Sequence, residues 1–192
     1  MAATLESARL SLLPWQKADV ALLRRLSADP CVVRYVGDGQ VWSVERAQET
    51  SDLIVEHWRE FDFGWWVMKL RQTGEQIGFA CLNHPHAQSG LEPTEFEIGW
   101  WLSPEFWRQG LSSEAAAAVR DDAFDRLGAP SVAARLQPAN HGSAGVARHI
   151  GMRHERDTVG MWGEPVAIYR GWAPSAGPAG RGQAHRPGTP LP

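Results

Sequence analysis

Hydrophobic positions in the first third of the chain alternate between strand spacing and helix spacing. An apolar run from Ala8 to Pro14 predicts a strand that the proline ends. Apolar residues then recur at helical spacing from Asp19 to Leu26 and from Val44 to about Phe61, where Ser43 is a suitable N-cap. The first third is therefore expected to form a strand followed by two helices.

The middle of the chain has the patterns of a β-hairpin and a further strand. Residues 65–70 and 76–82 are strand candidates, and Gly74 supplies the turn between them. Polar and apolar positions then alternate from Glu95 to Leu102, which predicts a strand with two different faces. One face carries Glu95, Glu97, Gly99 and Trp101, and the other carries Phe96, Ile98, Trp100 and Leu102.

The last third predicts a parallel strand pair and a closing hairpin. An alanine-rich helix is expected from Ser113 to Leu127, with Gly128 as its stop signal, and a short apolar strand follows at 131–136. A strand, a crossing helix and a second strand form a right-handed parallel βαβ unit. A short helix at 140–149 and two strands, at 152–159 and 166–172, complete the pattern.

Length and composition indicate one folded domain. The 192 residues are 43% hydrophobic, which is enough for one good core. From Pro174 to Pro192 the chain is rich in Pro, Gly, Ala and Arg, and this segment buries too little apolar surface to offset the entropy of ordering it. We therefore expect a folded domain over residues 1–173 and a disordered tail over residues 174–192.

Charge and apolar content argue against several classes of partner. The formal net charge of -3 is spread along the chain, so a nucleic-acid partner is not expected. The chain shows neither a signal peptide nor an apolar run long enough to span a membrane, so no membrane partner is expected. Cys31 and Cys81 lie far apart in apolar stretches, which indicates free, buried thiols and a cytoplasmic location.

The segment from Trp107 to Glu114, Trp-Arg-Gln-Gly-Leu-Ser-Ser-Glu, is the strongest candidate binding site. A helix N-terminus presents unpaired N–H groups and the positive end of the helix dipole, and both attract phosphate oxygens. Gly110 allows close approach of the backbone, Ser112 and Ser113 are small, and Arg108 adds a cation. The same residues are also compatible with a plain tight turn before a capped helix. The glycine patterns of P-loop and dinucleotide-binding proteins do not occur.

This block resembles the signature of the GNAT superfamily of N-acetyltransferases, in its branch of ribosomal-protein N-terminal acetyltransferases of the RimJ and RimL kind. The signature is Gln/Arg-x-x-Gly-x-Gly/Ala after a strand and a proline. Here Glu97 to Leu102 (Glu-Ile-Gly-Trp-Trp-Leu) and Pro104 precede it. Trp107 stands where Gln or Arg is usual and Ser112 where Gly or Ala is usual, so the phosphate cradle is expected to survive with some loss of affinity.

Two further blocks resemble the same superfamily in the same order. Asn140 to Met152 is similar to a segment that begins Asn-x-x-Ser/Ala and ends Gly-Phe, with Met152 in place of Phe, and Ala8 to Trp15 resembles the opening strand of the branch. The resemblance covers about residues 8–172. It implies an α/β (α+β) fold whose mixed central sheet has about six to seven strands, a splayed parallel pair and about four helices.

The resemblance also implies acetyl-CoA as the cosubstrate and no metal. It places the pantetheine arm between the splayed strands and the pyrophosphate at the glycine turn. The expected cosubstrate contacts are Trp101, Leu102, Ser103, Arg108, Gln109, Gly110, Leu111, Ser112, Ser113 and Asn140. Asn140 is equally typical of a turn residue after Pro138.

Transfer of an acyl group to an amine needs a neutral nucleophile and a proton for the leaving thiolate. An α-amino group with a pKa of about 8 is about one tenth neutral at pH 7, whereas a lysine at about 10.4 is neutral in about one molecule in two thousand. A weak base suffices for the α-amine. By its match to the superfamily, Glu97 is the expected base and Glu95 the alternative, although either residue also fits a solvated or salt-bridged strand position.

The acid that protonates the thiolate is less clear from the resemblance. Many relatives have a tyrosine seven residues after the asparagine, where this chain has Ala147. Ser143 matches the proposed acid of the RimL-like enzymes and is also a suitable N-cap for the last helix.

The sequence leaves the acceptor amine open, and it is compatible with a monomer or a homodimer. A protein N-terminal α-amine is favoured by the branch. The alternatives are a small-molecule amine, such as an aminoglycoside, polyamine or amino acid, and a non-catalytic acyl-CoA-binding module. An acidic pocket for a polycation would draw on Glu45, Glu49, Asp52, Glu56 and Glu60. Trp42, Trp65 and Trp66 are candidates for an aromatic pocket wall or for packing, and the histidines lack metal-ligand spacing.

Overall fold

The structure, a computed structural model, describes residues 3–85 and 89–174. These residues form one eight-stranded mixed sheet with helices on both faces. The strands are β1 (Leu5–Glu6), β2 (Leu10–Pro14), β3 (Trp65–Leu70), β4 (Gln76–Asn83), β5 (Glu97–Leu102), β6 (Ser131–Leu136), β7 (Arg153–Val159) and β8 (Pro165–Trp172). The helices are α1 (Val20–Ser27), α2 (Pro30–Val33), α3 (Val44–Phe61), α4 (Leu111–Asp125) and α5 (His141–His149), with single turns η1 (Lys17–Asp19) and η2 (Pro104–Phe106).

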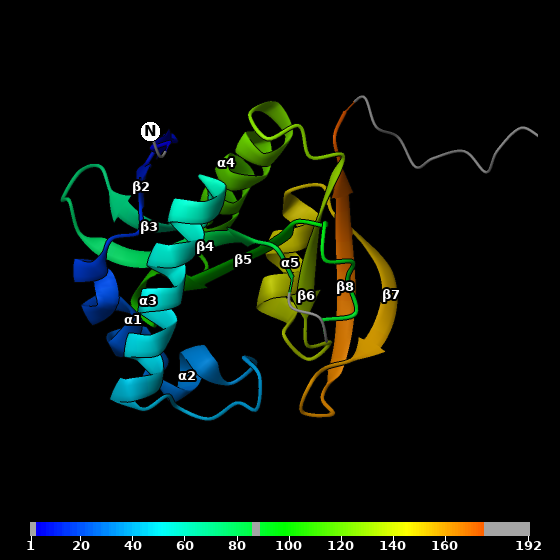
Figure 1. The fold of residues 1–192 in the computed structure, drawn as a ribbon, viewed down its shortest axis with the longest axis horizontal. Helices are drawn as coiled ribbons and strands as arrows, with labels where there is room; N and C mark the ends of the chain where they lie inside the picture. Colours follow the sequence, from blue (N-terminus) through cyan, green and yellow to red (C-terminus); the bar gives the residue numbers. More distant parts are fainter. Residues whose placement is uncertain (1–2, 86–88, 175–192) are drawn as a thin grey trace, which may run out of the picture.

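The sheet divides between β5 and β6. Its strand order is β1-β2-β3-β4-β5-β6-β8-β7, and β5 and β6 are its parallel neighbours. Within the described residues, one register pair joins them, Glu97 opposite Ala133, and the Ala133 amide donates to the Phe96 carbonyl at 2.8 Å. Beyond this pair the strands separate, and Figure 1 shows β3 to β5 running across the view while β6 and β8 run almost upright.

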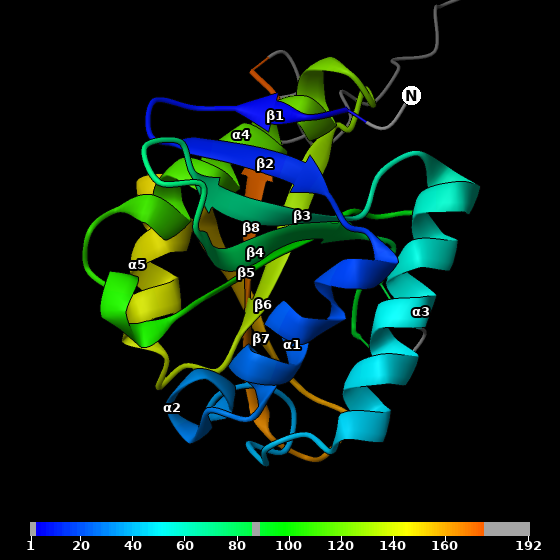
Figure 2. The same cartoon turned by 90° about the vertical axis from the view of Figure 1, so that its left-hand side faces the viewer.

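The helices cover opposite faces of the sheet. Figure 2 shows α1 and α3 on one side and α4 and α5 on the other, with α2 at the lower end of the molecule. The inner face of α4 consists of Ala115, Ala116, Val119 and Ala123, all fully buried. These small side chains allow the helix to lie close to the sheet, so its N-terminus reaches the point where β5 and β6 part.

Most predicted elements are confirmed, and the differences occur where the chain changes direction. The strands at 65–70 and 131–136 and the helix Val44–Phe61 have the expected bounds. The expected mixed sheet with a splayed parallel pair is confirmed, although the two-residue β1 brings the strand count to eight. The short helix α2 was not predicted from the sequence. Asp29 caps it by accepting from the Cys31 amide at 2.8 Å, so Pro30 begins a helix instead of only ending one.

Three other expectations concern single residues and the chain end. Cys31 and Cys81 are free thiols, but Cys31 is exposed because it lies on the surface helix α2. The expected tail over residues 174–192 lies outside the described residues except for Pro174. Among the described residues, no helix is both long and apolar enough to cross a membrane.

Gly78 on β4 is a point of close backbone packing. A Cβ atom at this position would lie 2.2 Å from the Trp101 carbonyl oxygen, so Gly78→Ala is expected to force β4 and β5 apart and to cost about 1–3 kcal/mol of unfolding free energy. Gly145→Ala in α5 is the matched control, because no atom lies within 4 Å of the added Cβ. That variant should gain about 0.5–1 kcal/mol. Urea denaturation of both variants measures the difference, and equal effects would contradict the packing argument.

Candidate functional site

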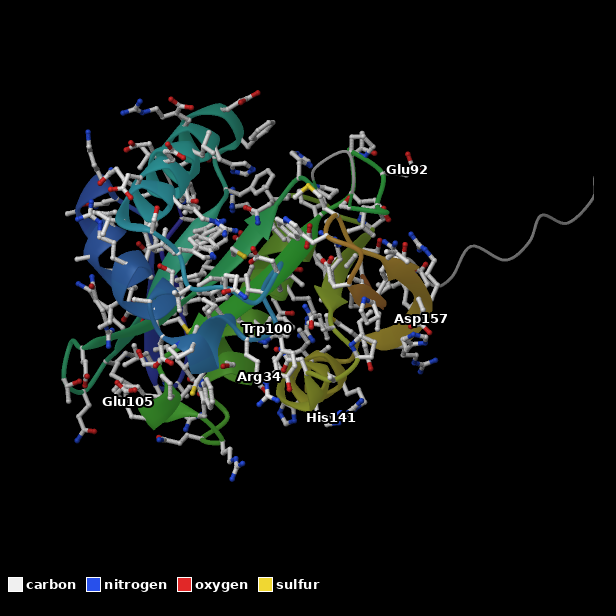
Figure 3. All side chains as sticks on the ribbon, turned by 90° about the horizontal axis from the view of Figure 1, so that it is seen from below. Arg34, Glu92, Trp100, Glu105, His141 and Asp157 are labelled. Atoms are coloured by element: carbon white, nitrogen blue, oxygen red, sulfur yellow. The ribbon has the colours of Figure 1, made fainter. Side chains whose placement is uncertain are left out.

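A cavity of about 1040 Å³ opens where β5 and β6 separate. Its walls come from α2 and the segment after it, β5, the turn into α4, β6, the start of α5 and the β7–β8 connection. Arg34, Trp100 and His141 all line it, and Figure 3 shows them gathered between α2 and α5 while Glu92 and Asp157 lie away from them. The cavity thus reaches from the α4 side of the splay to the α2 side.

The N-terminus of α4 forms one end of the cavity. Gly110 is the N-cap with a left-handed φ of 77°, and no side chain caps the helix. The first intrahelical bond of this turn runs from the Glu114 amide to the Gly110 carbonyl at 3.0 Å. The amides of Leu111, Ser112 and Ser113 therefore precede it without intrahelical acceptors, and all three residues line the cavity. These donors and the helix dipole favour an anion at this end.

A hydrogen-bond network from the N-terminal strands supports this turn from behind. The Glu114 carboxylate accepts from the Ser7 hydroxyl at 2.7 Å, the Arg9 amide at 2.6 Å and Arg9 Nε at 2.7 Å. Arg9 Nη1 also donates to the Gln109 carbonyl at 2.9 Å. Burial acts to raise the pKa of Glu114, but the hydrogen bonds from Arg9 and Ser7 outweigh it and hold the pKa below its ordinary value. We name Ser7, Arg9 and Glu114 the latch.

The latch was not predicted from the sequence. Arg9 and Glu114 are about a hundred positions apart and each looks like an ordinary charged surface residue. The only local signal was that Glu114 falls in the first turn of a helix, where an acidic side chain is common for dipole reasons.

The residues just before Gly110 fix the path of the turn. Arg108 has a φ of 61°, an uncommon left-handed conformation for a residue with a side chain. The Trp107 indole donates to the Leu102 carbonyl at 2.7 Å and is 42% exposed, so the ring ties the turn to the end of β5 while one surface stays open. Trp107, Arg108 and Leu102 all line the cavity.

Two expected cosubstrate contacts do not line the cavity. Ser103 is buried, and its amide donates to the Ile77 carbonyl at 2.9 Å, which continues the β4–β5 pairing. The Gln109 side chain folds back onto the Glu105 carbonyl at 3.0 Å. The other eight expected residues are Trp101, Leu102, Arg108, Gly110, Leu111, Ser112, Ser113 and Asn140, and the structure brings them together along the cavity.

The start of α5 brings Asn140 and Ser143 to the opposite wall. Asn140 is the N-cap, and its side-chain oxygen accepts from the Ser143 amide at 3.0 Å. The expectation that Ser143 caps this helix is therefore wrong, because Asn140 occupies that position. Both residues line the cavity. Ala147 is completely buried in the core, so the hydroxyl that many relatives have there is replaced by a methyl group.

Glu97 lies at the vertex where β5 and β6 part. It lines the cavity, and its Oε1 lies 3.8 Å from Nη1 of Arg135 on β6. Burial raises the pKa of the Glu97 carboxyl above its ordinary value, and the Arg135 charge acts in the opposite direction. Such a carboxylate is a stronger base than an exposed one.

Glu95 is differently placed. Its Oε1 lies 2.5 Å from Nη1 of Arg170, and its Oε2 accepts from the Glu92 amide at 2.7 Å. It does not line the cavity. Of the two glutamates considered from the sequence, only Glu97 faces the cavity.

The candidate acceptor features from the sequence lie elsewhere. Trp66 is fully buried, Trp65 stacks on Phe79 with ring centroids 4.5 Å apart, and Trp42 packs on Trp101 at 5.3 Å. Trp101 is the one of these four tryptophans that lines the cavity. The acidic residues Glu45, Glu49, Asp52, Glu56 and Glu60 are exposed on α3 and do not line it either.

The lining also includes a cysteine thiol. Cys81 lies below Gly99, and burial raises the pKa of its thiol to about 12, so it is protonated at neutral pH. Within residues 3–85 and 89–174, no cluster of three or more His, Cys, Asp or Glu side chains is arranged to hold a metal ion.

Comparisons with known proteins agree with this geometry. Residues 9–153 match the family described as acetyltransferase (GNAT) domain. YkkB of Bacillus subtilis, an uncharacterized protein, is 32% identical over 110 residues, 54% of this chain and 58% of YkkB. The FsC-acetyl coenzyme A-N(2)-transacetylase of Aspergillus fumigatus is 26% identical over 164 residues, 79% of this chain and 65% of that protein. The chain thus spans less than two thirds of the length of these two relatives.

Solved structures share the fold over nearly the whole chain. An acetyltransferase from Agrobacterium tumefaciens is 29% identical with a TM-score of 0.77, covering 90% of this chain and 96% of that one. RimL, a ribosomal alpha-N-protein acetyltransferase solved in complex with coenzyme A, is 18% identical with a TM-score of 0.72, covering 88% of this chain and 98% of that one. Because the family match extends over residues 9–153, well over half of the sequence, this chain belongs to the GNAT family of N-acetyltransferases.

Proposed function

We propose that this enzyme transfers the acetyl group of acetyl-CoA to a primary amine, and that the acceptor is the α-amine of a protein N-terminus. The observation that carries the proposal is a single cavity with an anion-binding helix terminus at one end and the base candidate Glu97 at the vertex of the splay. RimL, which shares the fold, is a protein α-N-acetyltransferase by its name. The proposal includes membership of the RimJ and RimL branch.

The residues present fit a CoA thioester. The amides of Leu111, Ser112 and Ser113, with Arg108 beside them, suit the pyrophosphate. Trp101 and Leu102 of β5 suit the pantetheine arm, which takes the place of the strand partner that β6 no longer provides. The Asn140 side-chain NH₂ group can donate to this arm because its oxygen is already taken by the Ser143 amide.

Glu97 serves as the general base in this proposal. The acceptor nitrogen forms a bond to the thioester carbon, the carbon–sulfur bond breaks, and the amine proton passes to Glu97. An α-ammonium group has a pKa of about 8, and the raised pKa of Glu97 brings the base closer to that value. Ser143 passes a proton to the departing thiolate and regains one from solvent, while the proton on Glu97 returns to solvent. The products are an N-acetyl amine and free CoA.

The charges of the cavity favour this acceptor over a polycation. Its lining includes three arginines, which are Arg34, Arg108 and Arg135, and two glutamates, which are Glu97 and Glu164. With Arg108 assigned to the pyrophosphate, the rest of the lining is balanced in charge. It therefore offers no excess of acidic side chains to hold the several positive charges of an aminoglycoside or polyamine. A peptide N-terminus brings one amine on an otherwise neutral backbone.

Thiol release from acetyl-CoA with a panel of amines tests the proposal. We expect release with peptides of free N-terminus and none with the same peptides carrying a blocked N-terminus. Release with small amines alone would replace the protein acceptor by a small-molecule one. Tight CoA binding without turnover on any amine would identify a non-catalytic binding module.

Glu97→Gln and Ser143→Ala test the two proton-transfer roles. We expect each to lower kcat by about 10²–10⁴-fold, the range for general acid–base groups, with little change in CoA affinity. Single-turnover assays and calorimetric CoA titrations provide the two measurements. Unchanged turnover in Ser143→Ala with normal CoA binding would show that the acid assignment is wrong.

Glu114→Gln tests the latch. The amide keeps the shape but loses the charge that holds Arg9, so we expect the Kd for CoA to rise about five- to thirtyfold, as for the loss of about 1–2 kcal/mol. Asp121→Asn on the solvent side of α4 is the control and should leave the Kd unchanged. An unchanged Kd in Glu114→Gln would mean that the turn holds its shape without the latch.

A further inference from the structure

Arg135 lies across the splay from Glu97. Glu97 pairs with Ala133 at the vertex, and Arg135 is two residues further along β6, so its side chain leaves the same face of the sheet. The Arg135 side chain is only 13% exposed, and both side chains line the cavity. The largely buried guanidinium of Arg135 on β6 therefore faces the carboxylate of Glu97 on β5, across the gap where the two strands diverge.

The charge of Arg135 opposes the effect of burial on Glu97. A carboxyl with a strongly raised pKa is protonated near neutral pH and cannot accept a proton from an ammonium group. Other groups near Glu97 do not replace Arg135. Cys81 on β4 is a neutral thiol whose own pKa is raised to about 12, and Asn83, the cross-strand partner of Glu97, is uncharged.

The remaining charges of the cavity lie on other elements. Arg34 follows α2, Glu164 lies in the β7–β8 connection, and Arg108 precedes α4. Glu95, two residues before Glu97, is held by Arg170 at 2.5 Å. Within residues 3–85 and 89–174, Glu97 forms its ion pair with Arg135.

We propose that Arg135 is a positioning residue that keeps Glu97 ionised and directed into the cavity at neutral pH. This inference rests on the proposed role of Glu97 as base. It adds the residue that sets the pH range over which Glu97 can accept a proton. Burial makes the carboxylate a better base, and Arg135 limits that effect so the group is not protonated before the amine arrives. The distance of 3.8 Å suits this role, because a closer bidentate pair would make the carboxylate a weaker base.

The test is the pH dependence of kcat/KM in Arg135→Met. Loss of an opposite charge within about 4–6 Å shifts a carboxyl pKa by about one unit or more, so the acid limb should move upward by at least about one pH unit. At pH values well below the wild-type midpoint this shift lowers the rate by at least about tenfold, and at high pH the rates converge. Arg135→Lys should restore most of the wild-type profile. Arg135→Gln serves as a second neutral variant if the methionine variant does not fold.

Arg148→Met is the matched control. Arg148 lies exposed on α5 and does not line the cavity, so the same change of charge there should leave the acid limb in place. A uniform loss of rate in Arg135→Met at every pH, with an unmoved acid limb, would overturn the proposal and leave Arg135 a merely structural residue.

Direct titration separates this inference from the proposed function. Carboxyl ¹³C signals of glutamate-labelled protein report the ionisation of Glu97 without any turnover, and Glu97→Gln identifies the signal by its loss. An upward shift of the Glu97 midpoint in Arg135→Met supports the influence of Arg135 even if Glu97→Gln retains activity, an outcome that would instead overturn the base assignment. An unmoved midpoint would overturn the inference by itself.

Discussion

The parallel pairing of β5 and β6 stops after one residue pair, and the remaining features of the site depend on that stop. Glu97 and Ala133 form this pair, so from Ile98 onward the edge of β5 that faces β6 borders a cavity, while its other edge stays paired with β4. Unpaired backbone groups of this kind are costly when buried, and an extended ligand that lies alongside as a further strand can satisfy them. The same stop directs Glu97 and Arg135 toward each other across the gap.

Helix α4 links this gap to the anion site. Its small inner residues allow it to lie against the sheet, and its N-terminus opens at the cavity beside β5. The turn that begins it contains two left-handed residues, Arg108 and Gly110. One of these is not a glycine, so the conformation is maintained by its surroundings, namely the Trp107 indole on one side and Arg9 on the other.

Features that depend on residues close together in the sequence were predicted correctly. Helical spacing from Val44 to Phe61 and the turn at Gly110 both depend on neighbours a few positions apart, and both are confirmed. The superfamily resemblance is confirmed as well, while the branch and the catalytic roles stay predictions. The pairing of Glu97 with Arg135 was not foreseen, because nothing in a single sequence gives the register between β5 and β6. Ser103 and Gln109 were expected as cosubstrate contacts from motif position alone. In the structure the Ser103 amide pairs with the Ile77 carbonyl of β4, and the exposed Gln109 side chain folds back onto the Glu105 carbonyl.

The latch makes the conformation of the turn before α4 depend on two distant parts of the chain. Arg9 and Ser7 come from the connection between β1 and β2 at the edge of the sheet, whereas Glu114 and Gln109 belong to the α4 turn. β1 is the edge strand of the sheet and has only two residues, and elements with few buried contacts are among the parts of a folded domain that open most readily. Any opening of β1 and β2 therefore also loosens the turn, and a bound anion there would in return stabilise the sheet edge by the same free energy. Binding at the turn and order at the first strands are thermodynamically linked in this protein, although the strands themselves never reach the cavity.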